Sequence, residues 1–193
     1  MKQKINSILP NHTLLEYDSD NFYVVDYKNI NGGDVELHEE EPADVKSVHL
    51  TNKKRITICF DGFKENALPR ENPGDHNRQC ECILFPNEED NTNWILCIET
   101  KYTDSIQNAF REKNNYPNCM IEQIVATVLY FREKGIIPND KKVNAIVSFP
   151  PLIDDFSAHF SRDRIAEILT THKINIRPTN KGRIISKKRI ALG

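Results

Sequence analysis

The chain has 193 residues, a net charge of −2 at neutral pH and a pI of about 6.3. This length supplies one substantial hydrophobic core and requires no second one, so we expect a single domain over residues 1–193. The charge provides no overall positive field for nucleic acid, and contact with nucleic acid would therefore need a local basic patch.

Cysteine usage and hydropathy exclude several protein classes. The five cysteines are an odd number, lie mostly in apolar runs and include no Cys-x-x-Cys pair, which argues against a disulfide framework and a zinc ribbon. The N-terminus lacks the apolar segment of a signal peptide, and no later apolar run approaches the length of a membrane span. We therefore expect a cytoplasmic protein that has no membrane contact.

The first part of the chain predicts short strands separated by polar loops. Residues 22–27 and 55–60 have the aromatic and β-branched content of strands. Residues 36–44 are acidic and turn-rich, and we predict a solvated loop there. Residues 63–78 contain two prolines and a glycine, so we predict a long loop that could border a cleft.

Two short apolar runs in the middle of the chain, residues 80–85 and 94–101, predict a pair of strands joined by a polar loop. Successive strand residues point to opposite faces. In the second run both faces are apolar up to residue 98. We therefore predict that this strand is central and covered on both sides.

Helical patterns dominate the rest of the chain. The apolar spacing predicts helices over residues 105–113, 118–134 and 162–172, a buried strand over 143–149, and a terminal hairpin formed by 174–177 and 183–186. Three strands that can meander, a helical crossover and a fourth strand together predict a mixed α/β sheet.

Acidic residues stand at an unusual place in the two middle strands. Glu81 lies near the start of the first strand, and the second strand ends in Glu99-Thr100-Lys101. A hairpin would bring the two carboxylates and the amine to the same rim of the sheet. Ionised groups are rarely buried unless they are paired or hold a metal, so a cation between the two carboxylates is one interpretation. A same-face ion pair of Glu99 with Lys101, with Glu81 at an edge or bulge, is the alternative.

This order of elements, with an acid in the second core strand and Glu-x-Lys ending the third, resembles the PD-(D/E)XK nuclease superfamily over residues of about 55–150. The resemblance implies a mixed central sheet of restriction-endonuclease type flanked by helices. It also implies a divalent metal held by Glu81 and Glu99, with the Thr100 carbonyl as a further ligand and Lys101 assisting the attacking water. Glu81 stands where the family usually has aspartate.

Two further positions follow from the same resemblance. Some members carry a glutamine on the helix after the third strand, which would be Gln123 here, and many carry an acid before the first core strand, for which Glu16 is a candidate. The helical spacing offers another interpretation of Gln123, because it projects away from the apolar arc centred on Ile121, Val125 and Val128. In that case it faces solvent.

The function implied by the resemblance is metal-dependent hydrolysis of phosphodiester bonds, in DNA rather than RNA, by a protein that works as a homodimer. Mg²⁺ or Mn²⁺ would be the cofactor, since Mg²⁺ takes oxygen ligands and retains waters. One alternative is a catalytically inactive member of the fold that binds protein or nucleic acid, and another is an unrelated α/β interaction protein. The basic C-terminal residues contact phosphate or form a solvated face; they are Lys181, Arg183, Lys187, Lys188 and Arg189.

Overall fold

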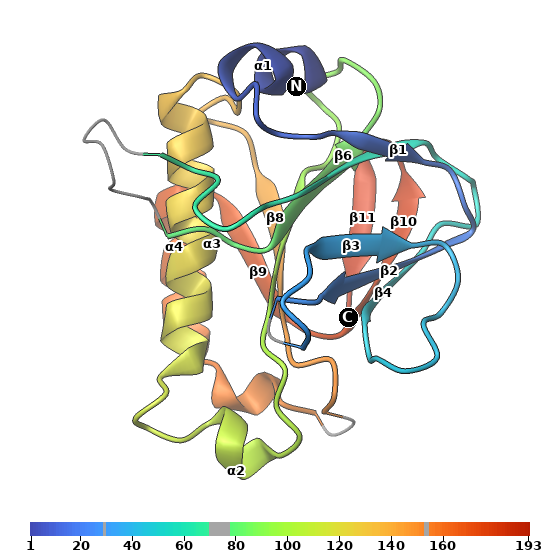
Figure 1. Cartoon of the computed structure of the whole chain (residues 1–193). Helices are drawn as coiled ribbons and strands as arrows, with labels where there is room; N and C mark the ends of the chain where they lie inside the picture. Colours follow the sequence, from blue (N-terminus) through green and yellow to red (C-terminus); the bar gives the residue numbers. More distant parts are fainter. Residues whose placement is uncertain (29, 70–77, 153–154) are drawn as a thin grey trace.

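The computed structural model describes residues 1–28, 30–69, 78–152 and 155–193, and its elements form three layers. Two sheets lie face to face, and helices cover the outer face of one of them (Figure 1). The helices are α1 (Lys2–Ile8), α2 (Ile106–Ala109), α3 (Tyr116–Glu133) and α4 (Arg162–His172), with a single 3-10 turn at Ser157–His159. The chain is therefore an α/β protein with two mixed sheets flanked by helices.

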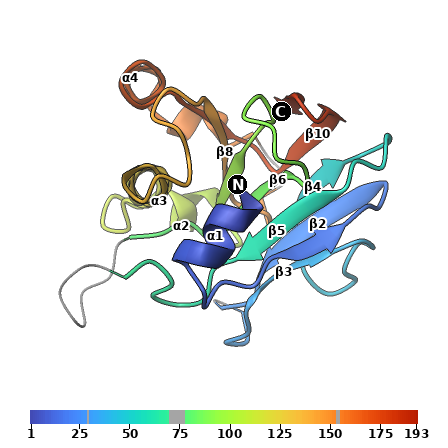
Figure 2. The ribbon, with the colours of Figure 1, turned by 90° about the horizontal axis from the view of Figure 1, so that it is seen from above.

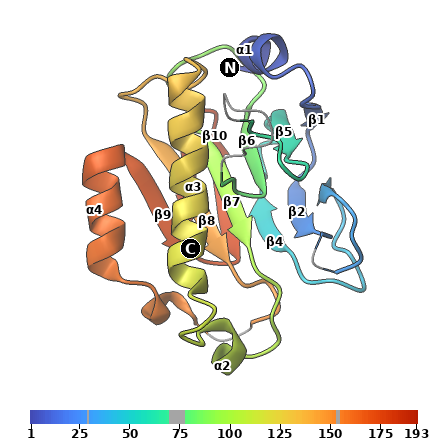
Figure 3. The same cartoon turned by 60° about the vertical axis from the view of Figure 1, so that its left-hand side comes forward.

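The first sheet has six strands, and its middle is the predicted meander. In spatial order the strands are β1 (Leu15–Tyr17), β5 (Ile58–Gly62), β6 (Cys82–Pro86), β7 (Leu96–Thr100), β8 (Val143–Ser148) and β9 (Ile174–Pro178). Strands β5, β6 and β7 pair antiparallel, and β8 and β9 are added parallel to β7. Helix α3 makes the crossover from β7 to β8, as the sequence predicted. Figure 3 shows α3 and α4 lying over β8 and β9.

The second sheet has five strands, and the sequence did not predict it. Its spatial order is β11 (Arg189–Leu192), β10 (Lys181–Ser186), β4 (Val48–Thr51), β2 (Asn21–Asp26) and β3 (Val35–His38). Strand β3 occupies part of the acidic stretch for which a loop was predicted, so that prediction is wrong for residues 36–38. The strand buries Val35 and Leu37 and leaves Glu36 exposed. Because β3 has only four residues, its alternation of apolar and polar side chains is hard to recognise among the neighbouring acidic residues.

Alternating side chains of β5, β6 and β7 divide the core into two clusters. Cys59, Ile83 and Cys97 pack towards the helices, whereas their neighbours Phe60, Leu84 and Leu96 pack towards the second sheet. All five residues of β7 are buried. The prediction that this strand is central and covered on both sides is confirmed. Figure 2 shows the three layers from above, with β6 and β8 between the helices and β2 and β3.

The predicted terminal hairpin of residues 174–177 with 183–186 is wrong, because the second of these segments pairs instead with the strand that follows it. Strand β9 belongs to the first sheet, and β10 crosses to the second, where it pairs with β11 and β4. Asn180 fixes this crossing: it accepts a hydrogen bond from Ser148 Oγ at 2.6 Å and donates to the Phe149 and Leu152 carbonyls at 3.1 Å. The segment around Asn180, which was predicted to be the turn of a hairpin, instead connects the two sheets.

The helices follow the sequence closely. Helix α4 has the predicted bounds, and α2 is shorter than predicted, with Ser105 accepting the capping hydrogen bond from the Asn108 amide. Helix α3 begins two residues earlier than predicted because Pro117, which was expected to interrupt, sits in the first turn, where its missing N–H costs nothing. No helix within the residues that the structure describes is long and apolar enough to cross a bilayer.

Candidate active site

The antiparallel pairing of β6 with β7 brings Glu81 and Glu99 to one rim of the first sheet. Cys82 lies opposite Ile98, and the Glu81 amide donates to the Ile98 carbonyl at 2.9 Å. The ladder ends at this pair, so Glu81 directly precedes β6, and Glu99 directly follows Ile98 on β7. The pairing therefore brings the two carboxylates to the same end of the two strands.

Lys101 stands between the two carboxylates. Its Nζ donates to Glu99 Oε1 at 2.6 Å and lies 3.9 Å from Glu81 Oε1. The structure thus brings together the three residues that the sequence singled out for catalysis. Burial works against the charge of Lys101, yet attraction to Glu99 and the hydrogen bond with it raise the pKa of the ammonium above its usual value. Lys101 is therefore a cation at neutral pH.

Glu99 is the most constrained member of the group. It is fully buried, and its Oε2 has no hydrogen-bond partner among the residues that the structure describes. Burial raises the pKa of Glu99 to about 8; Lys101 opposes this rise, and the charges of Glu81 and Asp26 add to it. A buried acceptor without a donor costs free energy, so this oxygen is available to a ligand that carries positive charge or a proton.

Two residues of the rim were missed by the sequence, and both come from the end of β2. Lys28 Nζ lies 2.9 Å from Glu81 Oε2. Asp26 is buried, its Oδ1 accepts from the Lys28 amide at 2.9 Å, and its charge adds to the burial that raises the pKa of Glu81. The alternation of side chains along β2 could have identified Asp26, because it follows Phe22 and Val24 on a face of the strand that is otherwise apolar.

The donor set fits a divalent ion in part. Glu81 and Glu99 offer carboxylate oxygens, one of them buried and unpaired, and Mg²⁺ prefers such ligands while keeping several waters. Within the described residues, however, no group of three or more His, Cys, Asp or Glu side chains is arranged to hold a metal. An ion here would therefore have two carboxylates and would complete its shell with other oxygens. Thr100, whose carbonyl is the predicted further ligand, is buried between Glu99 and Lys101.

Gln123 faces the sheet, so the alternative that it points to solvent is wrong. The buried arc of α3 is centred on Ile124 and Thr127 rather than on Val125, which is half-buried. Gln123 Nε2 donates to the Gln79 carbonyl at 2.8 Å, two residues before Glu81. It therefore supports the segment that leads into β6, and a direct role in catalysis stays a prediction.

Thr127 makes a second contact between α3 and this segment. Its Oγ1 accepts from the Cys80 amide at 2.9 Å and donates to the Gln123 carbonyl. We expect Thr127→Val, which keeps the shape and removes the acceptor, to lower the free energy of unfolding by about 1–3 kcal/mol, because the buried Cys80 amide loses its partner. Urea unfolding measures this loss. Thr170→Val on the exposed face of α4 is the control, and an equal effect of both changes would contradict the assignment.

Comparison with known proteins gives no match to a protein-family model, to a curated protein or to a solved structure.

Other candidate residues lie outside the rim. Glu16, the candidate for an acid before the first core strand, is on β1 and forms an ion pair with Lys2 at the surface. Arg78, at the end of the predicted cleft loop, pairs with Glu122 on α3. His76 lies outside the described residues, as do residues 70–77 of the predicted cleft loop. Asp61 is buried on β5 and contacts His12 Nδ1 at 2.7 Å.

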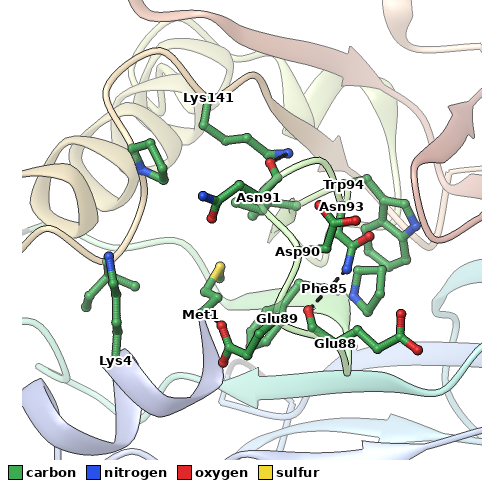
Figure 4. Close-up of a pocket in the computed structure, with 14 residues that line it drawn as sticks. Met1, Lys4, Phe85, Glu88, Glu89, Asp90, Asn91, Asn93, Trp94 and Lys141 are labelled. Carbon is green, nitrogen blue, oxygen red and sulfur yellow. Dashed lines mark hydrogen bonds and ion pairs between the residues drawn. The ribbon is translucent and has the colours of Figure 1, made fainter.

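A pocket of about 70 Å³ lies at the far end of β6, away from Glu81. The loop after β6 carries three acids along it, Glu88, Glu89 and Asp90, with Lys4 and Lys141 across the pocket (Figure 4). All three acids are paired: Glu88 with Lys187, Glu89 with the N-terminal amine and Asp90 with Lys188. The acids of this pocket are therefore already neutralised by ion pairs, and none of the rim residues lines it.

Proposed function

We propose that this chain is a metal-dependent nuclease of the PD-(D/E)XK type that hydrolyses phosphodiester bonds in DNA, with Mg²⁺ or Mn²⁺ as cofactor. The observation that carries the proposal is the buried, unpaired Oε2 of Glu99 beside Glu81 and Lys101. The antiparallel order β5, β6, β7 and the helical crossover to a parallel β8 support it, because this is the arrangement expected of a restriction-endonuclease-type sheet.

Each residue of the rim has a distinct task in this proposal. Glu81 and Glu99 would hold the divalent ion, which when bound neutralises charge that develops on the phosphate. Lys101 donates hydrogen bonds from a fixed position between the carboxylates, and there its ammonium orients the attacking water and favours hydroxide. Gln123 and Thr127 keep the segment before Glu81 in place.

The second candidate is a catalytically inactive member of the same fold that binds protein or nucleic acid. The observation in its favour is that Lys28 and Lys101 already contact Glu81 and Glu99, and that two carboxylates are a small donor set for a metal. In this case the rim is a structural ion-pair cluster.

A cleavage assay separates the two candidates. Plasmid, linear double-stranded DNA, single-stranded DNA and RNA are incubated with Mg²⁺, with Mn²⁺ or with EDTA. If the chain is a nuclease, we expect DNA to be cleaved with Mg²⁺ or Mn²⁺ and to stay intact with EDTA. If no substrate is cleaved with either ion, the inactive binding protein is the remaining candidate. Sedimentation of the same preparation tests the homodimer, and that assembly and a cytoplasmic location stay predictions.

Lys28 is expected to compete with the metal for Glu81. Its side chain is only 26% exposed, and its Nζ lies 2.9 Å from Glu81 Oε2. We expect Lys28→Met to bind Mn²⁺ about tenfold more tightly than the wild type, since a partly buried ion pair is worth on the order of 1 kcal/mol. Calorimetry measures the affinity. Lys54→Met, which removes an exposed cation, is the matched control; unchanged or weaker binding by Lys28→Met would show that the lysine has another role.

A further inference from the structure

The outer face of the five-stranded sheet carries a row of polar and aromatic side chains. Lys181 of β10 lies opposite His49 of β4, His49 opposite Tyr23 of β2, and Tyr23 opposite His38 of β3. Four neighbouring strands thus place four directly opposed residues in one line. These four residues are far apart along the chain, so local sequence patterns do not connect them.

The row lies on the accessible side of the sheet. Its sequence neighbours Phe22, Val24, Leu37 and Leu50 are buried in the cluster between the two sheets, and side chains alternate between the faces of a strand. Lys181 is exposed, and the three rings are half-buried. A ligand can therefore reach the row without rearrangement of the core.

The two central rings are already arranged as a stack. Tyr23 and His49 have ring centroids 4.6 Å apart and an interplanar angle of 4°. His49 Nε2 lies 3.0 Å from Asn21 Oδ1, an acceptor, so this nitrogen carries a proton. His38 is held at the end of the row by Tyr27, whose hydroxyl lies 3.2 Å from His38 Nε2.

Positive charge lies beside the rings on β10. Arg183 is exposed and opposes Thr51, which in turn opposes Asn21, so the next row of the face is also free of acids. Acidic charge is also present: Glu36 lies 3.4 Å from His38, and Glu41 is close enough to His49 to favour its charged form. The basic residues of the C-terminus are therefore divided: Lys187 and Lys188 pair with the acidic loop, whereas Lys181 and Arg183 border the rings.

We propose that this face binds single-stranded nucleic acid, with bases extending the Tyr23–His49 stack and phosphates on Lys181 and Arg183. Aromatic stacking combined with a cationic border is the chemistry by which proteins hold single strands, because only unpaired bases expose their ring faces. As a statement about the substrate, the inference rests on the proposed nuclease function. Strand β2 supports that link, since it carries Tyr23 on this face and ends at Asp26 and Lys28 on the rim.

Fluorescence anisotropy in EDTA tests binding without cleavage. The probes are a labelled 20-nucleotide thymidine strand, a uridine strand of the same length and a DNA duplex. We expect the wild type to prefer the single strands. Tyr23→Ala and His49→Ala should each weaken binding by about tenfold, since stacking contributes roughly 1–3 kcal/mol per base.

A charge-matched pair of variants tests the phosphate contacts. Lys181→Gln with Arg183→Gln should weaken binding by at least tenfold and reduce the salt dependence by about 1.4 in the slope of log K against log salt, at roughly 0.7 per phosphate contact on a single strand. The control removes two exposed cations elsewhere, by Lys142→Gln with Arg162→Gln. All four changes are at the surface, and thermal unfolding monitors the fold.

Three results would overturn the inference: no binding of single strands by the wild type, equal loss in the control pair, or binding insensitive to both Tyr23→Ala and His49→Ala. None of them depends on catalysis. If single strands bind at this face and no cleavage is found, the nuclease proposal fails and the binding proposal stands. If the protein cleaves DNA with metal and the four substitutions leave its binding affinity unchanged, the binding proposal fails and the nuclease proposal stands.

Discussion

Glu99→Gln is expected to reduce metal-dependent DNA cleavage by about 10³-fold or more with the fold intact. The amide keeps the shape and the acceptor for Lys101 Nζ, but it removes the negative charge and replaces the unpaired Oε2 by a nitrogen that cannot coordinate a cation. Metal-ion stabilisation of transition-state charge is worth several kcal/mol, and each 1.4 kcal/mol is a factor of ten in rate.

Glu112→Gln provides the matched control, because it makes the same chemical change at an exposed side chain that is not part of the rim. Initial rates of plasmid nicking at fixed Mn²⁺ measure the effect, and calorimetry on the same samples measures metal binding. Equal rates for Glu99→Gln and the wild type would remove Glu99 from catalysis.

Lys101→Met adds a separate test. A loss of cleavage rate of about 100-fold with Mn²⁺ affinity retained would show that the lysine acts on the attacking water rather than on metal binding.

Local sequence patterns predicted the part of the fold that holds the rim. The apolar runs at β6 and β7 have a short connection, so their pairing and the approach of Glu81 to Glu99 follow from a hairpin. The crossover helix α3 was visible in the spacing of Ile121, Ile124 and Val128, which are all buried. In these segments the hydrophobic pattern and the local pairing agree.

The missed features depend on contacts between distant segments. Lys28 reaches Glu81 because the five-stranded sheet packs on the first sheet. The apolar alternation of β2 and β3 predicts a buried face, but it does not identify the sheet on which that face packs. The route of the C-terminus depends on Asn180, which binds the end of β8 through three hydrogen bonds. A turn-forming asparagine predicts a hairpin from its neighbours alone, and its partners at residues 148–152 cannot be read from local spacing.

The rim also predicts an unusual dependence of stability on pH in the absence of metal. The pKa of Glu99 is raised from 4.5 to about 8 by burial. Between these pH values the unfolded chain releases the proton that the native protein keeps, so the native state binds more protons and stability falls as the pH rises. The expected loss for this group is about 3 kcal/mol at pH 7, at roughly 1.4 kcal/mol per pKa unit. Lys101 does not change the pH dependence of stability between pH 4.5 and 8, because its raised pKa affects stability only near and above pH 10.5.

Glu99→Gln should therefore be more stable than the wild type by about 3 kcal/mol at pH 7 and should match it near pH 4.5, because the amide does not ionise. Urea unfolding in EDTA from pH 4.5 to 8 measures the difference in the free energy of unfolding between the two proteins. Glu81 and His12 also have raised pKa values, but both proteins retain these groups, so their contributions to the pH dependence largely cancel in the difference. Parallel stability curves would show that Glu99 is ionised and satisfied without metal. A variant that gains stability while losing cleavage would instead mean that the buried carboxylate is kept for its chemistry, since catalytic groups are often held at a cost to the fold.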